Sequence, residues 1–150
     1  MIRHMNQTEL TKKIHILYAD DDKLMRQIVG GQLAKKGFEV LYATDGNEAR
    51  DMARRLQPEL ILLDYRMPIF DGLTTAKYLK SEEVTKHIPV ILFTNEDLSV
   101  EGQKMWSEQG LDGYVHKSAD PQDFYQKITE VLVKYGHAIP EPQMPGGPKE

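Results

Sequence analysis

Short apolar runs alternate along the chain with longer stretches in which apolar residues recur every three or four positions. A short run predicts a buried strand, and the longer period predicts a helix with one apolar face. The predicted strands are Ile14–Ala19, Phe38–Ala43, Glu59–Leu63, Pro89–Phe93 and Gly113–His116. This alternation is typical of βα units on a parallel sheet.

A predicted helix follows each strand. The helical stretches are Lys23–Lys36, Asp45–Gln57, Gly72–Ser81, Ser99–Gln109 and Asp120–Tyr135. Gly37 stops the first helix, and Asp120 followed by Pro121 starts the last. Asp45 and Glu48 have the spacing of a capping box at the start of the second helix.

The apolar faces of these helices differ in strength. The first two helices carry apolar residues at helical spacing at Leu24, Met25, Ile28, Val29, Leu33, Ala49, Met52, Ala53 and Leu56. The Ser99–Gln109 stretch has only Val100, Met105 and Trp106 across about three turns. Weak anchorage leaves this helix the easiest to move. For Trp106 we favour core or surface filling over the role of partner anchor.

Five strands and five helices are too few for an eight-stranded barrel. We therefore expect an open, flavodoxin-like doubly wound (βα)5 fold with a five-stranded parallel sheet of order 2-1-3-4-5. The domain is predicted over residues 13–136, after a tag-like flexible segment at 1–12. A disordered tail is predicted at 137–150, where four prolines and two glycines leave little to bury. We expect no further domain after Gly136.

Composition narrows the classes of function. A chain of 150 residues with 40% hydrophobic residues and a net charge of -4 is typical of one soluble domain. The absence of cysteine excludes disulfides and thiolate chemistry. The net acidity and the lack of a long basic run argue against direct nucleic-acid binding, and no apolar run is long enough to span a membrane. We expect a cytoplasmic protein.

Three carboxylates fall where predicted strands end. Asp20 and Asp21 close the first strand, and Asp64 closes the third. In the expected strand order these strands are neighbours, so the three side chains share one crevice at the carboxyl edge of the sheet. Two charges about 4 Å apart repel by roughly 4 kcal/mol near a protein surface. A hard cation such as Mg²⁺ offsets this repulsion and leaves room for phosphate oxygens, which predicts a phosphoryl site.

The same edge supplies the other parts of a phosphoryl site. Asp64 is the candidate nucleophile, because an aspartate can form an aspartyl phosphate. Pro68 biases the residues before it toward an extended turn, which would leave the Asp64 carboxylate exposed above the sheet. Thr94 and Lys117 follow the fourth and fifth strands, where a hydroxyl and an ammonium group can stabilise the transferring group.

Four motifs, in order and at matching spacing, resemble those of a known family. They are Tyr-Ala-Asp20-Asp21-Asp-Lys-Leu-Met-Arg-Gln-Ile-Val, Leu-Leu-Asp64-Tyr-Arg-Met-Pro68-Ile-Phe-Asp-Gly72, Leu-Phe-Thr94-Asn-Glu and Gly113-Tyr114-Val-His-Lys117. Over about residues 13–135 the chain resembles the response-regulator receiver domain of two-component signalling.

The resemblance implies a phosphoacceptor and a metal site. Asp64 would accept the phosphoryl group, and Asp20, Asp21 and Asp64 would hold Mg²⁺ together with the backbone carbonyl of Arg66. The donor would be a histidine kinase or a histidine phosphotransfer protein. Such a domain assists its own phosphorylation and dephosphorylation but is not otherwise an enzyme.

The resemblance also implies a switch. Thr94 would be the switch hydroxyl, Lys117 the phosphoryl contact and Tyr114 the rotating aromatic. For Tyr114, a half-buried strand aromatic without a switch role stays open. The output would pass to a downstream protein through the face formed by the Ser99–Gln109 helix, the Gly113–His116 strand and the last helix. Alternatively, the phosphoryl group would pass onward to another histidine.

Two features could modify the site. Arg66 and Glu96 stand two residues beyond Asp64 and Thr94, at positions that tune hydrolysis in this family. Pairing of Arg66 with Glu96 could keep water from the acyl phosphate. Ser118 replaces the proline that usually follows the family's lysine, which could reposition Lys117.

Other polar residues have plainer explanations. Asp22 is expected to cap the first helix. Asp71-Gly72 is expected to provide turn and helix-start chemistry. His15, His87 and His116 have no mutual metal spacing.

Two other classes of function stay open. One is a receiver-like binding module that signals without phosphorylation. The other is an aspartate-nucleophile phosphohydrolase, which is disfavoured because Arg66 occupies the position where those enzymes generally place an acid/base aspartate.

Overall fold

The computed structural model describes residues 13–142. Its centre is one five-stranded sheet in the order β2-β1-β3-β4-β5, and every neighbouring pair of strands is parallel. The strands are β1 (His15–Ala19), β2 (Glu39–Ala43), β3 (Leu60–Leu63), β4 (Val90–Thr94) and β5 (Gly113–His116). The predicted fold class and strand order are confirmed.

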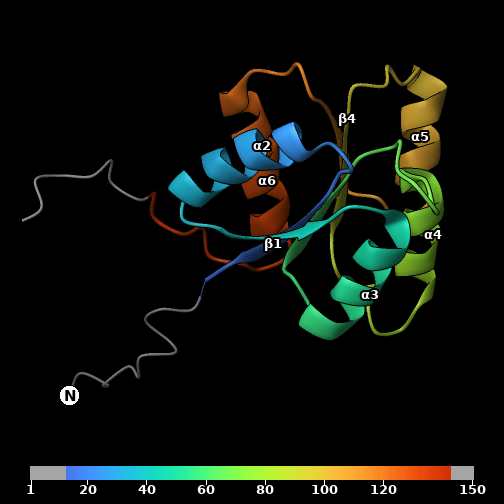
Figure 1. The fold of residues 1–150 in the computed structure, drawn as a ribbon, viewed down its shortest axis with the longest axis horizontal. Coiled ribbons are helices and arrows are strands. Elements are labelled where there is room, and N and C mark those ends of the chain that lie inside the picture. The colour runs from blue at the N-terminus through green and yellow to red at the C-terminus, as the bar shows by residue number, and fades with distance from the viewer. Residues whose placement is uncertain (1–12, 143–150) are drawn as a thin grey trace, which may run out of the picture.

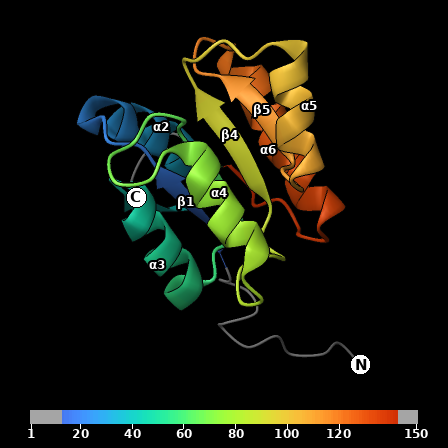
Figure 2. The same ribbon diagram turned by 90° about the vertical axis from the view of Figure 1, so that its right-hand side faces the viewer.

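Helices cover both faces of the sheet (Figures 1 and 2). They are α2 (Lys23–Lys35), α3 (Gly46–Leu56), α4 (Gly72–Ser81), α5 (Val100–Glu108) and α6 (Pro121–Lys134). The pair α2 and α6 covers one face, and α3, α4 and α5 cover the other. None of the described helices is long and apolar enough to cross a membrane.

Polar side chains fix where the helices begin. Asp22 caps α2 by accepting a 2.9 Å hydrogen bond from the Leu24 N–H, as predicted. Asp71 caps α4 by accepting from the Thr74 N–H. An oxygen acceptor at the N-cap satisfies a backbone donor that has no partner inside the helix. Asp22 and Asp71 are therefore structural caps at the edge where the site forms.

The apolar rows of two helices were partly misassigned. Leu24 and Ile28 are 62% and 47% exposed, whereas Val29 and Leu33 are buried against the sheet. Leu24 and Ile28 form one row along α2, and Val29 and Leu33 form a second row offset by one residue. Only one of these rows can face the centre of the sheet. Leu56 is also exposed, because it is the last residue of α3.

Trp106 anchors α5. Its side chain is 2% exposed and lies in the core cluster between the sheet and α3, α4 and α5. Val100 and Met105 are 81% and 44% exposed. Of the three apolar residues predicted to anchor α5, only Trp106 is therefore buried.

The segment after α6 is partly placed against the domain. Residues 137–142 have no regular structure, but Ile139 packs against the core cluster under α2 and α6. The backbone of Glu141 passes Gly37, whose φ of +96° favours glycine and where a Cβ would lie 2.5 Å from the Glu141 carbonyl oxygen. Part of the predicted disordered tail is thus packed, and residues 143–150 lie outside the described range, as does the predicted 1–12 segment.

Truncation of Ile139 tests whether this segment stabilises the domain. Ile139→Ala should lower the free energy of unfolding by about 1 kcal/mol, less than the roughly 2–5 kcal/mol of a fully buried isoleucine. Urea denaturation measures the change. Val133→Ala, at a position 60% exposed on α6, should change it by no more than about 0.5 kcal/mol. Equal effects of the two substitutions would show that Ile139 contributes nothing specific.

Candidate functional site

The pleat of the sheet brings three predicted site residues to one face. Alternate residues of a strand point to the same side. The residues two positions before Asp20, Asp64 and Lys117 all belong to the core cluster under α2 and α6; they are Tyr18, Leu62 and Val115. The Asp20 and Asp64 N–H groups continue the strand pairing by donating to carbonyls of neighbouring strands. The three charged side chains therefore emerge together at the carboxyl edge.

Lys117 joins the two buried carboxylates. Its Nζ donates to Asp20 Oδ2 over 2.6 Å and to Asp64 Oδ2 over 2.9 Å. The side chains are 6%, 0% and 10% exposed for Lys117, Asp20 and Asp64. Burial acts to lower the pKa of Lys117, but the hydrogen bonds to the two carboxylates outweigh it and the net pKa is raised. Lys117 is therefore a fixed positive charge at neutral pH.

Asp21 completes a group that could hold a metal ion. Carboxylate oxygens of Asp20, Asp21 and Asp64 lie within 4.8 Å of one another, and Asp21 is exposed. One lysine against three carboxylates leaves a net negative charge. Oxygen donors with an open approach suit Mg²⁺, which keeps several waters and takes few protein ligands. The donor set thus fits the predicted cofactor.

These residues line a cleft of about 670 Å³ at the carboxyl edge of the sheet. Arg66, Thr94 and Glu96 also line it, so the structure brings together every predicted site residue except Tyr114. Tyr114 lies on the opposite face of the sheet, packed against the cluster under α3, α4 and α5. Thr94 is 1% exposed, and Leu92, two residues before it in β4, belongs to that same cluster.

The predicted switch and tuning residues meet at Glu96. The Glu96 N–H donates to Thr94 Oγ1 over 3.2 Å, and the Tyr114 hydroxyl donates to the Glu96 carbonyl oxygen over 2.7 Å. The Arg66 guanidinium bonds to the Glu96 carboxylate. The hydrogen bond to Arg66 lowers the pKa of Glu96, and the same bond raises the pKa of Arg66. Glu96 thus ties the loop after β4 to Thr94 at the end of β4, to Tyr114 in β5 and to Arg66 in the loop after β3.

Lys117 contacts Asp20 and Asp64 with Ser118 as the next residue. No cis peptide bond occurs in residues 13–142, so the Lys117–Ser118 bond is trans. The Ser118 N–H lies 3.0 Å from His116 Nδ1 and the Ser118 hydroxyl 2.7 Å from it. The Lys117 N–H donates to the Thr94 carbonyl over 2.8 Å. These bonds hold the loop in place of the usual proline.

Two contacts to Asp20 were missed by sequence reasoning. The Tyr18 hydroxyl donates to Asp20 Oδ2 over 2.5 Å, and Arg26 Nη1 donates to the Asp20 backbone carbonyl over 2.8 Å. In an apolar run, Tyr18 is indistinguishable from a core filler. Its separation of two residues from Asp20 was the available signal, since that spacing places both side chains on one face of a strand.

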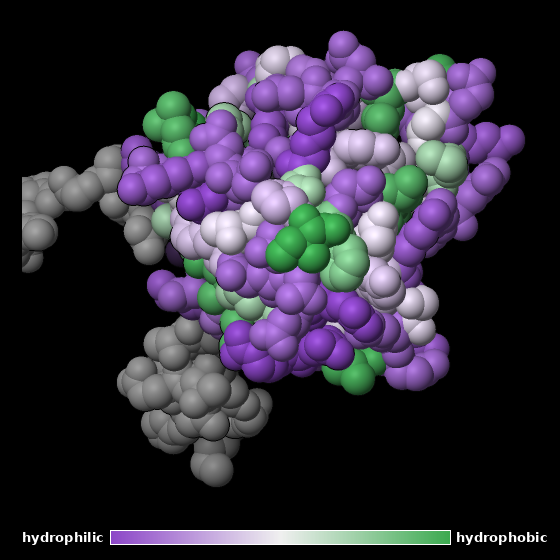
Figure 3. Space-filling model, turned by 45° about the vertical axis from the view of Figure 1, so that its right-hand side comes forward, coloured by the Kyte–Doolittle hydropathy of each residue, from purple (hydrophilic) through white to green (hydrophobic). Residues whose placement is uncertain are grey.

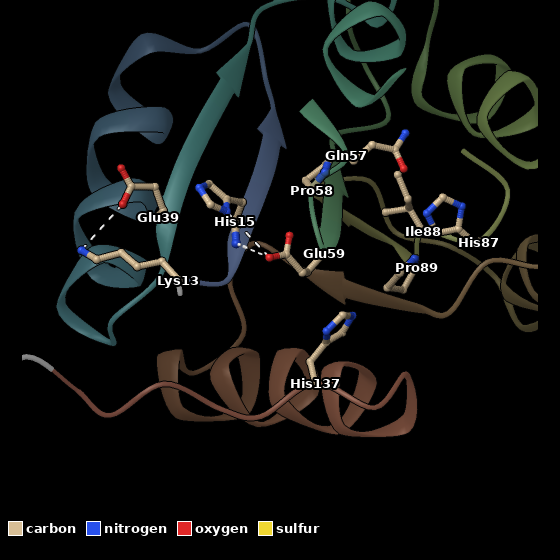
Figure 4. A pocket seen from close by; sticks show the side chains of 10 residues that line it. All are labelled: Lys13, His15, Glu39, Gln57, Pro58, Glu59, His87, Ile88, Pro89 and His137. Atoms are coloured by element: carbon tan, nitrogen blue, oxygen red, sulfur yellow. Dashed lines mark hydrogen bonds and ion pairs between the residues drawn. The ribbon is translucent and has the colours of Figure 1, made fainter. Parts of the chain in front are cut away.

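A second cleft lies at the opposite edge of the sheet (Figure 4). Its volume is about 770 Å³, and His15, Glu59, His87 and His137 are among its lining residues. His15 Nδ1 lies 3.7 Å from Glu59 Oε1. Among the described residues, however, only the three aspartates form a group with closely spaced metal-ligand atoms. We place the site at the smaller cleft, because parallel sheets bind ligands at their carboxyl edge.

The side of the molecule that carries α4 and α5 shows apolar groups separated by polar ones (Figure 3). Exposed apolar residues of these helices and their loops are Ile69, Val84, Val100 and Met105. Isolated exposed apolar residues are ordinary on a soluble domain.

The doubly wound parallel sheet has acidic residues directly after β1 and β3 and a lysine directly after β5, at the edge where such sheets bind ligands. The sequence model of the response regulator receiver domain matches residues 16–129. The chain belongs to the response-regulator receiver family.

Individual relatives agree with this assignment. The polar-differentiation response regulator DivK of Brucella ovis is 30% identical over 123 residues, which cover 82% of this chain and 98% of DivK. The phosphate regulon transcriptional regulatory protein PhoB of Pseudomonas aeruginosa is 32% identical over 124 residues, 81% of this chain and 52% of PhoB. The chain therefore spans about half the length of PhoB.

Solved structures give the same fold. The chemotaxis response regulator CheY4 of Vibrio cholerae superposes with a TM-score of 0.73 at 28% identity and covers 79% of this chain and 98% of CheY4.

Replacement of Lys117 tests the charge balance of the site. Lys117→Met should lower the free energy of unfolding by about 3 kcal/mol at neutral pH, because it leaves two buried carboxylates without their cation. Added Mg²⁺ should stabilise this variant more than the wild type. Thermal and urea unfolding measure both effects. Lys104→Met, at an exposed lysine of α5, is the control, and an equal loss in both variants would contradict the account.

Proposed function

We propose that this receiver domain accepts a phosphoryl group on Asp64 from a phosphohistidine partner, in a reaction that depends on Mg²⁺. The observation that carries the proposal is the buried bond from Lys117 to Asp64 at the mouth of a cleft with two further carboxylates. A lysine held against the acceptor is already placed to contact the incoming phosphoryl oxygens.

The geometry favours Asp64 Oδ1 as the attacking atom. Oδ2 is bonded to Lys117, and Oδ1 has no hydrogen-bond partner within residues 13–142. In the proposed step a bond forms between Asp64 Oδ1 and phosphorus while the phosphorus–nitrogen bond of the phosphohistidine breaks. The nitrogen keeps the electron pair of that bond, and the imidazole leaves as the neutral ring after it takes up a proton.

Asp20, Asp21 and Asp64, with the backbone carbonyl of Arg66, would hold the metal ion. When bound, Mg²⁺ supplies positive charge that offsets the repulsion between an anionic donor and an anionic acceptor. Lys117 contributes a second positive charge from the buried side of the cleft. The transferring group would thus meet cationic groups on two sides.

Phosphorylation would act on the loop after β4 through Thr94. The Thr94 hydroxyl accepts from the Glu96 N–H in this structure. An acyl phosphate on Asp64 offers a strong acceptor, and a Thr94 hydroxyl drawn toward it would weaken that bond. Glu96 also accepts from Tyr114 on β5, so the change would reach β5 and the start of α5. A ligand shifts such an equilibrium only by its differential affinity for the two states.

The output would pass through the face made by α5, β5 and α6. Val100, the first residue of α5 after the loop that contains Glu96, and Met105 of the same helix are exposed apolar residues. Movement of that loop would change how these residues are presented to a downstream protein. The donor would be a histidine kinase or a histidine phosphotransfer protein. Acidic composition and the absence of a basic run favour protein over nucleic acid as the partner.

Substitution of the acceptor tests the proposal. Wild-type protein incubated with Mg²⁺ and acetyl phosphate should gain one phosphoryl group by intact mass, and Asp64→Asn should gain none, because an amide oxygen is a poor nucleophile. Asp22→Asn should be modified like the wild type, since asparagine also caps a helix.

The alternative functions give other results. An unmodified wild-type protein would favour a binding module that works without phosphorylation. Steady release of phosphate over many rapid turnovers would favour a phosphohydrolase. An adduct that persists in Asp64→Asn would contradict the choice of acceptor.

The Arg66–Glu96 pair should lengthen the lifetime of the acyl phosphate. Both residues line the cleft that contains Asp64, where the pair would restrict the approach of water to the acyl phosphate. Arg66→Ala should lose the phosphoryl group roughly two- to fivefold faster than the wild type, a modest effect in keeping with an exposed pair. Loss of phosphate from purified phosphoprotein measures the rate. Arg54→Ala, on α3, should leave the rate unchanged, and equal rates for wild type and Arg66→Ala would contradict the prediction.

A further inference from the structure

The buried hydroxyl of Tyr18 lies against a carboxylate of the candidate metal site. Tyr18 is fully buried in β1, and its hydroxyl donates to Asp20 Oδ2 over 2.5 Å. A phenolic hydroxyl keeps its proton at neutral pH and so donates to the Asp20 carboxylate, which only accepts.

Protein donors occupy most of the Asp20 carboxylate. Oδ2 accepts from the Tyr18 hydroxyl and from Lys117 Nζ, and Oδ1 accepts from the Asp22 N–H over 2.9 Å. A carboxylate has about four lone-pair sites. Within residues 13–142, these three bonds leave roughly one site, on Oδ1, to face a cation or one of its waters. The orientation of the carboxylate therefore decides whether that site points into the cleft.

The Tyr18 ring is itself held in place. Its centroid lies 6.0 Å from that of Phe93, which stacks at 4.3 Å on Phe124 of α6. These aromatic contacts fill the core under α2 and α6. Close-packed side chains do not shift without disturbing their neighbours. The Tyr18 hydroxyl is thus held in place, and a rotation of the Asp20 carboxylate would break the hydrogen bond between them.

We infer that Tyr18 is a positioning residue of the metal site, which fixes the Asp20 carboxylate so that its remaining lone pair faces the cation. This inference rests on the proposed function, because it concerns the same Mg²⁺ site. Hydrogen-bond partners of metal ligands orient those ligands, and their loss typically weakens metal binding by about 10- to 100-fold.

Isothermal titration with Mg²⁺ at constant pH tests the inference. Tyr18→Phe keeps the ring and removes only the hydroxyl, and it should raise the dissociation constant for Mg²⁺ by about tenfold. Tyr42→Phe is the matched control. Tyr42 is the register partner of Tyr18 on β2, and its hydroxyl lies over Gly30 rather than in the cleft. The affinity of Tyr42→Phe for Mg²⁺ should equal that of the wild type.

The outcomes separate the two proposals. Equal dissociation constants for wild type and Tyr18→Phe, whatever the change in stability, would make the hydroxyl a core contact only and overturn the inference. A wild-type protein that does not bind Mg²⁺ would instead overturn the proposed function. Circular dichroism shows whether Tyr18→Phe is folded.

A measurement on the wild-type protein keeps the inference testable if the variant does not fold. In protein labelled with ¹³C at tyrosine Cζ, the Tyr18 resonance can be assigned from the contact of its ring with Phe93. Saturation with Mg²⁺ should shift this resonance, since the cation withdraws charge from the carboxylate that accepts its hydrogen bond. The Tyr42 resonance should stay in place. A Tyr18 resonance that does not move would contradict the inference.

Discussion

The rest of the site depends on the two hydrogen bonds that Lys117 donates to Asp20 and Asp64. These bonds bring together the residues that directly follow β1, β3 and β5. Two carboxylates buried at this edge would repel each other strongly without a cation, and the lysine supplies one. Because Asp21 adds a further negative charge nearby, the site stays short of positive charge and is receptive to a divalent ion.

The pleat of the sheet divides the predicted site residues between its two faces. Asp20, Asp64 and Lys117 continue the face packed under α2 and α6, whereas Thr94 and Tyr114 continue the face packed under α3, α4 and α5. Glu96 bonds to Thr94 and Tyr114 of the second set and also to Arg66, which stands two residues after Asp64. Under the proposed function, a phosphoryl group on Asp64 would act through Thr94 and Glu96 on the loop that leads into α5, a helix whose one buried hydrophobic side chain is Trp106.

Sequence patterns were sufficient for the architecture and for the cluster of charged residues, because apolar runs and strand-end carboxylates are properties of single segments. They were insufficient where the burial or the role of a side chain depends on a distant part of the chain that packs against it. The two apolar rows of α2 have equal spacing, and only the sheet decides that Val29 faces inward and Ile28 does not. Ile139 packs because the chain turns back toward Gly37. Tyr18 has a polar role only because its hydroxyl reaches Asp20.

A crystal structure of the protein grown with Mg²⁺ and beryllofluoride, a stable mimic of a phosphoryl group on aspartate, would show directly whether Asp64 is the acceptor in a site completed by Lys117 and a cation. We expect a beryllofluoride group on Asp64 Oδ1, in contact with Lys117 and with a metal ion held by Asp21. A beryllofluoride group on another residue, or a metal ion away from the three aspartates, would contradict it.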